Sequence, residues 1–242
     1  MVKIGSLARF FNKYEDEVLF AKENNFDFMQ LWYDNRGISL STDEEDPIYL
    51  INKYNFPTII HAVLNVDEFE EHIPKLIKIL KEINHKDLIV HPICTTILID
   101  ETTLDLLNTK VRFALDLLNK EGITLYLENN SKLDPIFTNS EEIEKIFESN
   151  KDLEFILDVA HIDNLKHLEE MVKIKMPKIL HVADKHFDVI HEHLPIGHGE
   201  LDFKYIFNNI LKDFDGRIIL EIVNTDLDIV NSKNIISNIV NK

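Results

Sequence analysis

The chain has 242 residues, of which 45% are hydrophobic, with only six glycines and seven prolines. This length and composition allow a large buried core and exclude a disordered or fibrous protein. Lysine and arginine total 26 against 43 acidic residues, and the resulting net charge of −17 argues against long contacts with nucleic-acid phosphates or an anionic membrane surface.

Eight short apolar runs alternate with longer segments of helical periodicity. We predict strands at residues 2–6, 26–32, 57–63, 87–93, 123–129, 155–162, 178–184 and 217–223. Amphipathic helices are predicted at 67–83, 101–120, 140–149 and 203–214, with a shorter, less regular segment at 43–54 and a short polar tail at 239–242. Eight strand and helix units of about 30 residues each are what a (β/α)₈ barrel needs.

A doubly wound open sheet would show the same alternation of strands and helices. However, the sequence has no GxGxxG or GxxxxGK[ST] motif, and no glycine-rich turn follows the first strand. No linker or break in composition divides the chain. We therefore predict an α/β fold, a single (β/α)₈ TIM barrel spanning residues 1–242.

The cysteine content and the N-terminal residues bear on the compartment. The single cysteine, Cys94, excludes an internal disulfide framework and a cysteine-based zinc cluster. The first residues lack the apolar region of a secretory signal, and no stretch approaches the roughly 18 apolar residues of a membrane span. We expect a cytoplasmic protein without a membrane partner.

Acidic residues and histidines interrupt six of the eight apolar runs near their carboxyl ends, where a TIM barrel builds its active site. A lone buried carboxylate or imidazole is costly unless it is paired or bound to a metal. One such histidine would be an ordinary core residue, but six consecutive strands with such residues predict a metal site. The residues are His61, His91, Glu128, Asp158 with His161, His181 and Glu221.

Glu128, Asp158, His181 and Glu221 form a mixed oxygen and nitrogen ligand set. Such a set suits divalent ions, with zinc or manganese favoured and magnesium, cobalt or iron as alternatives.

A second group of polar residues lies at 191–203, HEHLPIGHGELDF. His191 and His193 are two positions apart, so both could face one ion. An ordinary polar loop could, however, have the same sequence pattern. Gly197 and Gly199 would allow the backbone to turn closely under the site. Asp202 could cap the following helix.

The remaining candidates have weaker signals. Phe10 with Phe11 and Trp32 with Tyr33 could wall a substrate pocket or simply pack in loops. Lys185, together with Asn35, Arg36 and His186, could hold an anionic group of a substrate. We expect Cys94 to be a small buried residue, and we expect surface positions for three histidines, His72, His85 and His167.

The series IIHAVLNV, LIVHPI, LYLENN, LDVAHI, LHVADKH, HEHLPIGHGELDF and ILEIV resembles the xylose isomerase-like TIM-barrel superfamily. The resemblance covers nearly the whole chain, with its elements in family order. This superfamily includes sugar and sugar-phosphate isomerases and epimerases, and the endonuclease IV group of abasic-site repair enzymes.

The two branches imply different ligand sets. In the isomerase and epimerase branch the metal quartet falls on Glu128, Asp158, His181 and Glu221, while His161 contacts substrate. In the endonuclease IV branch His61 and His91 join this quartet around two ions, and a third ion is held by His161, His191 and His193.

The sequence departs from both branches. His191 stands where the endonuclease branch has aspartate, and Leu64 stands where that branch usually has a tyrosine. Phe187 replaces a phosphate-binding arginine that some epimerases carry. The net charge and the presence of only four arginines favour a small substrate over DNA.

We expect a divalent-metal-dependent sugar or sugar-phosphate isomerase or epimerase that transfers a proton through a metal-stabilised enediolate. Glu128 and Glu221 would exchange the proton and His161 would orient a hydroxyl, with Trp32 and Lys185 as further substrate contacts. The alternative is an endonuclease IV-like phosphoesterase with several zinc ions, acting on abasic-site DNA or another phosphodiester. A third is an inactive metal-binding barrel. The partner expected is a small carbohydrate, and no particular oligomeric state is predicted.

Overall fold

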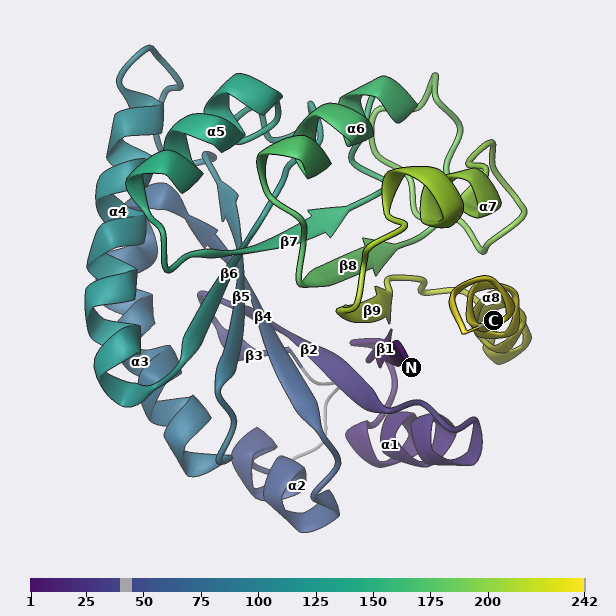
Figure 1. Ribbon diagram of the computed structural model, residues 1–242. Coiled ribbons are helices and arrows are strands. Elements are labelled where there is room, and N and C mark those ends of the chain that lie inside the picture. The colour runs from purple at the N-terminus through teal and green to yellow at the C-terminus, as the bar shows by residue number, and fades with distance from the viewer. Residues whose placement is uncertain (40–44, 242) are drawn as a thin grey trace.

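The computed structural model describes residues 1–39 and 45–241. Within them eight parallel strands form a closed barrel, because each pairs with the next and the last, β9, pairs with the first, β1 (Figure 1). The strands are β1 (Lys3–Leu7), β2 (Phe28–Asp34), β4 (Thr58–Asn65), β5 (Asp87–Ile93), β6 (Thr124–Glu128), β7 (Glu154–Asp158), β8 (Ile179–Val182) and β9 (Arg217–Leu220). The predicted (β/α)₈ barrel is thereby confirmed. A short strand, β3 (Gly37–Ile38), extends β2 as an antiparallel hairpin.

Helices surround this barrel and cover its outer face (Figure 1). They are α1 (Tyr14–Glu23), α2 (Pro47–Tyr54), α3 (Phe69–Glu82), α4 (Thr103–Leu118), α5 (Ser140–Ser149), α6 (Leu165–Ile174), α7 (Phe203–Tyr205) and α8 (Asp226–Val240), with 3-10 turns at Val66–Glu68 and Asn119–Glu121. The apolar stripe of α3 is buried as its spacing predicts, since Phe69, Ile73, Leu76 and Leu80 have no exposed surface. None of the helices in the described part of the chain combines the length and apolar character needed to cross a membrane.

Two predicted helical segments and the predicted tail differ in detail. The segment 203–214 is a single turn, α7, followed by a π-helix over Ile206–Ile210, and Asp202 caps it as expected by accepting from the amide of Tyr205. In the segment 43–54 the helix begins at Pro47, and residues 43 and 44 lie outside the described residues. The expected polar tail is wrong for its first residues, because Ile239 is buried and α8 therefore continues to Val240.

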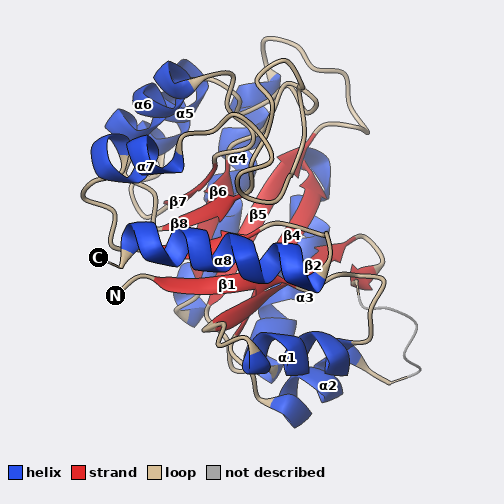
Figure 2. Cartoon of the chain, turned by 90° about the vertical axis from the view of Figure 1, so that its right-hand side faces the viewer, coloured by secondary structure: helices blue, strands red, loops and turns tan. Residues whose placement is uncertain are grey.

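The two ends of the described chain lie beside each other (Figure 2). The backbone amide of Val2 donates to the side-chain oxygen of Asn241 at 3.0 Å. This contact joins the residue before β1 to the end of α8.

A separate apolar cluster, here called the plug, fills the barrel between the strands. Each of seven strands contributes one residue to it, namely Phe28, Ile59, Ile89, Tyr126, Ile156, Ile179 and Ile219. The eighth strand, β1, has Gly5 opposite Phe28, and a Cβ there would lie 2.5 Å from the Phe28 ring. Gly5 therefore leaves the space that this ring occupies, and the plug closes one end of the barrel.

Candidate metal centre

Seven polar side chains, here called the polar ring, lie one layer above the plug. Successive side chains of a strand point to opposite faces, so the residue two positions after each plug residue faces the same interior. Those positions lie on the carboxyl side of the plug and are all buried, with exposed fractions of 8% or less. The polar ring consists of Gln30, His61, His91, Glu128, Asp158, His181 and Glu221.

Four members of the polar ring can hold one ion. Glu128, Asp158, His181 and Glu221 each present a ligand atom, and these atoms lie within 4.8 Å of one another. Nδ1 of His181 lies 2.9 Å from Oε1 of Glu128 and 3.3 Å from Oε2 of Glu221. The structure thus brings the predicted quartet together.

The donor atoms of this quartet fit a divalent cation. Oε2 of Glu128 is buried and makes no hydrogen bond, although Nε2 of His61 and Nδ1 of His91 lie 2.8 and 3.1 Å away. A buried carboxylate oxygen without a donor is costly, and a bound cation would satisfy it. Three carboxylates and one imidazole are also a ligand set suited to zinc or manganese.

Opposite charges inside the polar ring shift its pKa values strongly. Burial alone would raise the pKa of Glu128, but the nearby His181 and His91 hold it well below its usual range. Burial alone would lower the pKa of His181, yet the carboxylates of Glu221 and Glu128 raise it to about 9. The pKa of His91 is raised to about 10, against the effect of burial, by Glu128 and Asp134. Without a metal ion, imidazolium groups therefore balance the carboxylates.

Gln30 is the member of the polar ring that the sequence analysis missed. Its amide nitrogen lies 3.1 Å from a Glu221 oxygen and donates to it, because a carboxylate oxygen can only accept. This orientation of the amide turns its oxygen toward His181. Nε2 of His181 donates to that oxygen at 2.7 Å, so Nδ1 of a neutral His181 keeps its lone pair for the quartet. The amide nitrogen of Gln30 also lies 3.2 Å from Nδ1 of His61, which places the proton of a neutral His61 on Nε2.

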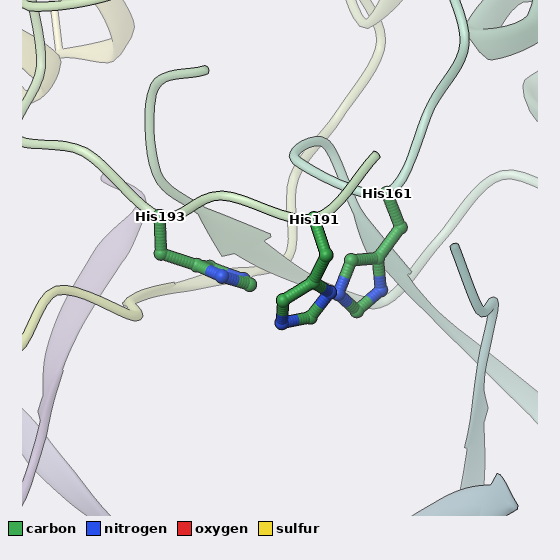
Figure 3. Close-up of side chains that lie close together, drawn as sticks. All are labelled: His161, His191 and His193. Carbon is green, nitrogen blue, oxygen red and sulfur yellow. The ribbon is translucent and has the colours of Figure 1, made fainter. Parts of the chain in front are cut away.

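A second group of ligands, here called the imidazole cluster, consists of His161, His191 and His193. Their rings turn toward one another, and one nitrogen of each lies within 4.8 Å of the others (Figure 3). Nδ1 of His161 donates to the backbone oxygen of Asn129 at 2.9 Å, which leaves its buried Nε2 without a partner. Nδ1 of His191 lies 3.3 Å from the Ser131 hydroxyl.

The imidazole cluster adjoins the quartet through Asp158. Nε2 of His193 lies 3.1 Å from Oδ2 of Asp158 and 3.4 Å from Oε2 of Glu221. Burial lowers the pKa of His161 and of His191, so both rings are neutral at pH 7 and can act as ligands. The two predicted ligand groups are thus adjacent.

Asp184 positions the loop that carries His191 and His193. Its buried carboxylate accepts from the backbone amides of Gly197, Gly199 and Leu201 at 2.8, 2.9 and 3.1 Å. Gly197 has a φ of +91°, and a Cβ on Gly199 would lie 2.4 Å from the Lys185 carbonyl oxygen. Both glycines are therefore required by the close turn that the sequence predicts.

A cavity of about 450 Å³, here called the metal-facing cavity, opens above the polar ring and the imidazole cluster. Apolar residues form part of its lining and include Trp32, which the sequence predicts as a substrate contact. None of the described residues that line it is a lysine or an arginine. The apolar wall residues are Leu7, Trp32, Val63, Ile93, Leu133 and Val223.

Several of the sequence predictions require correction. Lys185 does not line the metal-facing cavity, because its ammonium group is buried and donates to the Ile162 carbonyl at 3.0 Å. His72 is not a surface residue, because it is only 3% exposed and its Nδ1 lies 2.8 Å from the Tyr33 hydroxyl. His85 and His167, also expected at the surface, are half-buried, as is Cys94.

Comparison with known proteins supports the fold. The profile of a family described as xylose isomerase-like TIM barrel matches residues 18–238. No curated protein sequence matches the chain. A crystal structure of a D-tagatose 3-epimerase-like protein is 22% identical with a TM-score of 0.75, and the match covers 99% of this chain and 98% of that one.

Two further solved structures are similar over almost their full lengths. D-psicose 3-epimerase from Clostridium cellulolyticum H10, solved with D-tagatose, is 12% identical with a TM-score of 0.76 and 99% coverage of both chains. The IolI protein, solved with a bound zinc atom, is 13% identical with a TM-score of 0.73, covering 99% of this chain and 98% of its own. Because the family profile matches residues 18–238, which are most of the chain, the chain belongs to the xylose isomerase-like TIM-barrel family.

Proposed function

We propose that the protein is a divalent-metal-dependent isomerase or epimerase of a small, neutral keto or aldo sugar. The observation that carries this proposal is the buried quartet, in which Glu128 and Glu221 line the metal-facing cavity and present ligand atoms within 4.8 Å of those of Asp158 and His181. Similar structures include proteins named D-psicose 3-epimerase and L-ribulose 3-epimerase, and their names are consistent with sugar chemistry at this site.

A divalent ion held by the quartet would act as a Lewis acid toward two neighbouring oxygens of the sugar and so acidify the adjacent C–H bond. Zinc or manganese suits the ligand set, and the similar IolI structure contains zinc. Because the amide oxygen of Gln30 accepts from Nε2 of His181 and leaves Nδ1 of that ring free, the contacts support one ion in the quartet.

Glu128 and Glu221 would remove and return the proton at carbon. They come from β6 and from the end of β9, which are three strands apart in a ring of eight, so their carboxylates approach the cavity from different sides. Both have pKa values well below the usual range, so both are ionised at neutral pH and able to accept a proton. His161, whose Nδ1 donates to Asn129, would accept a hydrogen bond from a sugar hydroxyl through Nε2.

The charge of the metal-facing cavity favours an unphosphorylated sugar. A phosphate group carries about two negative charges and normally binds to arginine, lysine or helix amides. The described residues lining this cavity include acidic groups, Glu128, Asp134 and Glu221, but no lysine or arginine. A phosphorylated substrate would therefore meet carboxylates without a compensating side chain.

The test is proton exchange between sugar and solvent. The zinc- or manganese-loaded protein should incorporate deuterium from D₂O at the carbon next to the carbonyl of one sugar in a panel of free ketoses and aldoses. Glu221→Gln and Glu128→Gln should each slow this exchange by about 100-fold or more. The exposed Glu148→Gln on α5 is the matched control and should retain the rate. Failure to exchange with any sugar while metal is bound would contradict the proposal and favour an inactive barrel.

The imidazole cluster supports a second candidate function, a phosphoesterase with two or three ions. His61, His91 and Glu128 also present donor atoms within 4.8 Å of one another, which a multi-ion site would require. Metal analysis separates the two candidates, because the isomerase needs one ion in the quartet and a His61→Ala variant should keep it. Two or three ions per chain, with cleavage of an abasic-site oligonucleotide, would establish the phosphoesterase instead.

A further inference from the structure

We propose that the sugar acted on at this site carries a second, uncharged sugar ring, which binds in a separate cavity beside the metal centre. This inference rests on the proposed function and concerns the size and chemistry of the substrate. It comes from a cavity of about 530 Å³ that none of the quartet residues lines.

The second cavity, here called the aromatic cavity, adjoins the metal-facing cavity. The two share Trp32 and Val63, which form a common wall between them. The aromatic cavity is bounded on its other sides by residues that follow β1 and by the hairpin of β2 and β3. Its described lining consists of Phe10, Trp32, Tyr33, Asp34, Arg36, Gly37, Ile38, Ser39 and Val63.

The combined space exceeds what a monosaccharide needs. Small-molecule sites typically measure about 300–1,000 Å³ and enclose most of a ligand that is larger than one sugar ring. The metal-facing cavity alone, at about 450 Å³, falls in this range. A single sugar ring bound above the quartet would therefore occupy the metal-facing cavity only. The aromatic cavity of about 530 Å³ would then contain water.

The wall of the aromatic cavity suits the apolar face of a pyranose or furanose ring. The Phe10 and Trp32 rings stack with a centroid distance of 5.8 Å and an angle of 14°. Phe10 is nevertheless 49% exposed, so an aromatic side chain at the rim remains largely uncovered. A sugar ring has one face of C–H groups that can pack on an aromatic plane and an edge of hydroxyls that requires polar partners.

Polar partners lie in the same cavity, and those among the described residues carry no net charge. Arg36 donates to both carboxylate oxygens of Asp34, at 3.1 and 3.2 Å through Nε, so the two charges compensate each other. Ser39 adds a hydroxyl to the lining. These groups can bind hydroxyls, but they offer neither an unpaired cation for a phosphate nor an unpaired carboxylate for an amine. The second unit is therefore uncharged.

The order of the cavities sets the orientation of the substrate. The reacting carbonyl and its neighbouring hydroxyl lie over the quartet, and the second ring is linked through the far end of the reacting sugar. A disaccharide whose reducing unit is a ketose has this arrangement.

The experiment uses Trp32, the only tryptophan of the chain, as the reporter of binding. The zinc-loaded protein is titrated with D-fructose and with three ketose-ended disaccharides, lactulose, maltulose and isomaltulose, while tryptophan fluorescence is followed. At least one disaccharide should bind about tenfold more tightly than D-fructose. The Phe10→Ala variant should lower this ratio to near one. Phe11→Ala is the matched control, since Phe11 is 56% exposed but does not line the aromatic cavity, and it should keep the ratio.

The outcomes separate this inference from the proposed function. If no disaccharide binds more tightly than D-fructose, or if Phe10→Ala keeps the ratio, the second ring is excluded. Deuterium exchange of a free monosaccharide would in that case still support the isomerase or epimerase. Tight disaccharide binding without exchange at carbon would support the two-ring site and contradict the proposed reaction. Thermal unfolding of Phe10→Ala close to that of the parent protein would show that the variant is folded.

Discussion

Gln30 determines which nitrogen of His181 is available to a metal ion. Its amide contacts His181, His61 and Glu221 within 3.2 Å, and it has no exposed surface. Groups that orient a ligand in this way commonly change metal affinity by 10- to 100-fold when they are removed. At the scale of single residues, the centre therefore depends on a neutral side chain that binds no metal itself.

The first prediction concerns this amide. Gln30→Leu keeps a side chain of similar size but removes both hydrogen-bonding groups, so His181 and Glu221 lose their support. We expect zinc affinity to fall about 10- to 100-fold, as measured by competition with a chelator. Glu148→Gln serves as the control. Unchanged affinity in Gln30→Leu would show that the orientation of His181 does not depend on Gln30.

The second prediction concerns pH. His181 has a pKa of about 9 in the absence of metal, and binding through Nδ1 must displace its proton. The carboxylates of the quartet have lowered pKa values and are already ionised at pH 7. Metal affinity should therefore rise by about tenfold per pH unit from pH 7 to 9 and level off above pH 9. Calorimetry in buffers of different ionisation enthalpy would count the released proton, and an affinity independent of pH would exclude His181 as a ligand.

Residue type and position allowed much of this centre to be predicted from the sequence. Histidines and acids near strand ends identified six positions of the polar ring, whereas Gln30 was missed because a neutral amide in an apolar run is no signal for a metal. Its position two residues after Phe28 would have revealed it. His72 was misplaced although it is three residues after Phe69 and four before Leu76, on the buried stripe of α3. The direction of the Lys185 side chain depends on Ile162, which is distant in the sequence.

At the scale of elements, the loop between β8 and α7 brings His191 and His193 to the cavity. One buried carboxylate, Asp184, accepts hydrogen bonds from several amides of this loop, and a backbone bridge joins it to Leu194. The sequence suggested the close turns through Gly197 and Gly199, but it contained no sign that Asp184 was their acceptor. Such a network depends on contacts that form only in the folded chain.

The third prediction tests this loop. Asp184→Ala leaves the amides of Gly197, Gly199 and Leu201 without an acceptor, which should lower the free energy of unfolding by about 3 kcal/mol. Asp188→Ala lies in the same loop at an exposed position and should change stability by less than about 0.5 kcal/mol. Chemical denaturation followed by circular dichroism measures both. Equal stabilities for the two variants would mean that Asp184 does not fix the loop.

At the scale of the whole molecule, closure of the barrel depends on β1 meeting both β2 and β9. Gly5 lies at this junction, where its missing side chain makes room for the Phe28 ring inside the barrel. The sequence predicted eight strands and their order. It did not predict that a glycine in one strand makes room for a large ring in the neighbouring strand. Packing inside the barrel depends on which residues of neighbouring strands lie opposite each other. The sequence alone does not show this register.

The fourth prediction tests the closure. Gly5→Ala would place a methyl group 2.5 Å from the Phe28 ring, which the surrounding plug prevents from moving away. We expect a loss of about 1–3 kcal/mol in the free energy of unfolding. The double variant Gly5→Ala with Phe28→Leu should recover part of this loss, as a double-mutant cycle would show. Additive effects would contradict a direct clash.

The spacing of two residues between plug and polar ring also limits which insertions and deletions the strands of this barrel can tolerate. A one-residue insertion within a strand reverses the direction of every later side chain in it. In β4, for example, such an insertion before Ile59 would turn both Ile59 and His61 toward the helices. Stability and chemistry would then be lost together. Deletions in the strands of related barrels should accordingly come in pairs of residues or lie in loops, while single substitutions at the ring can alter the reaction and leave the plug intact.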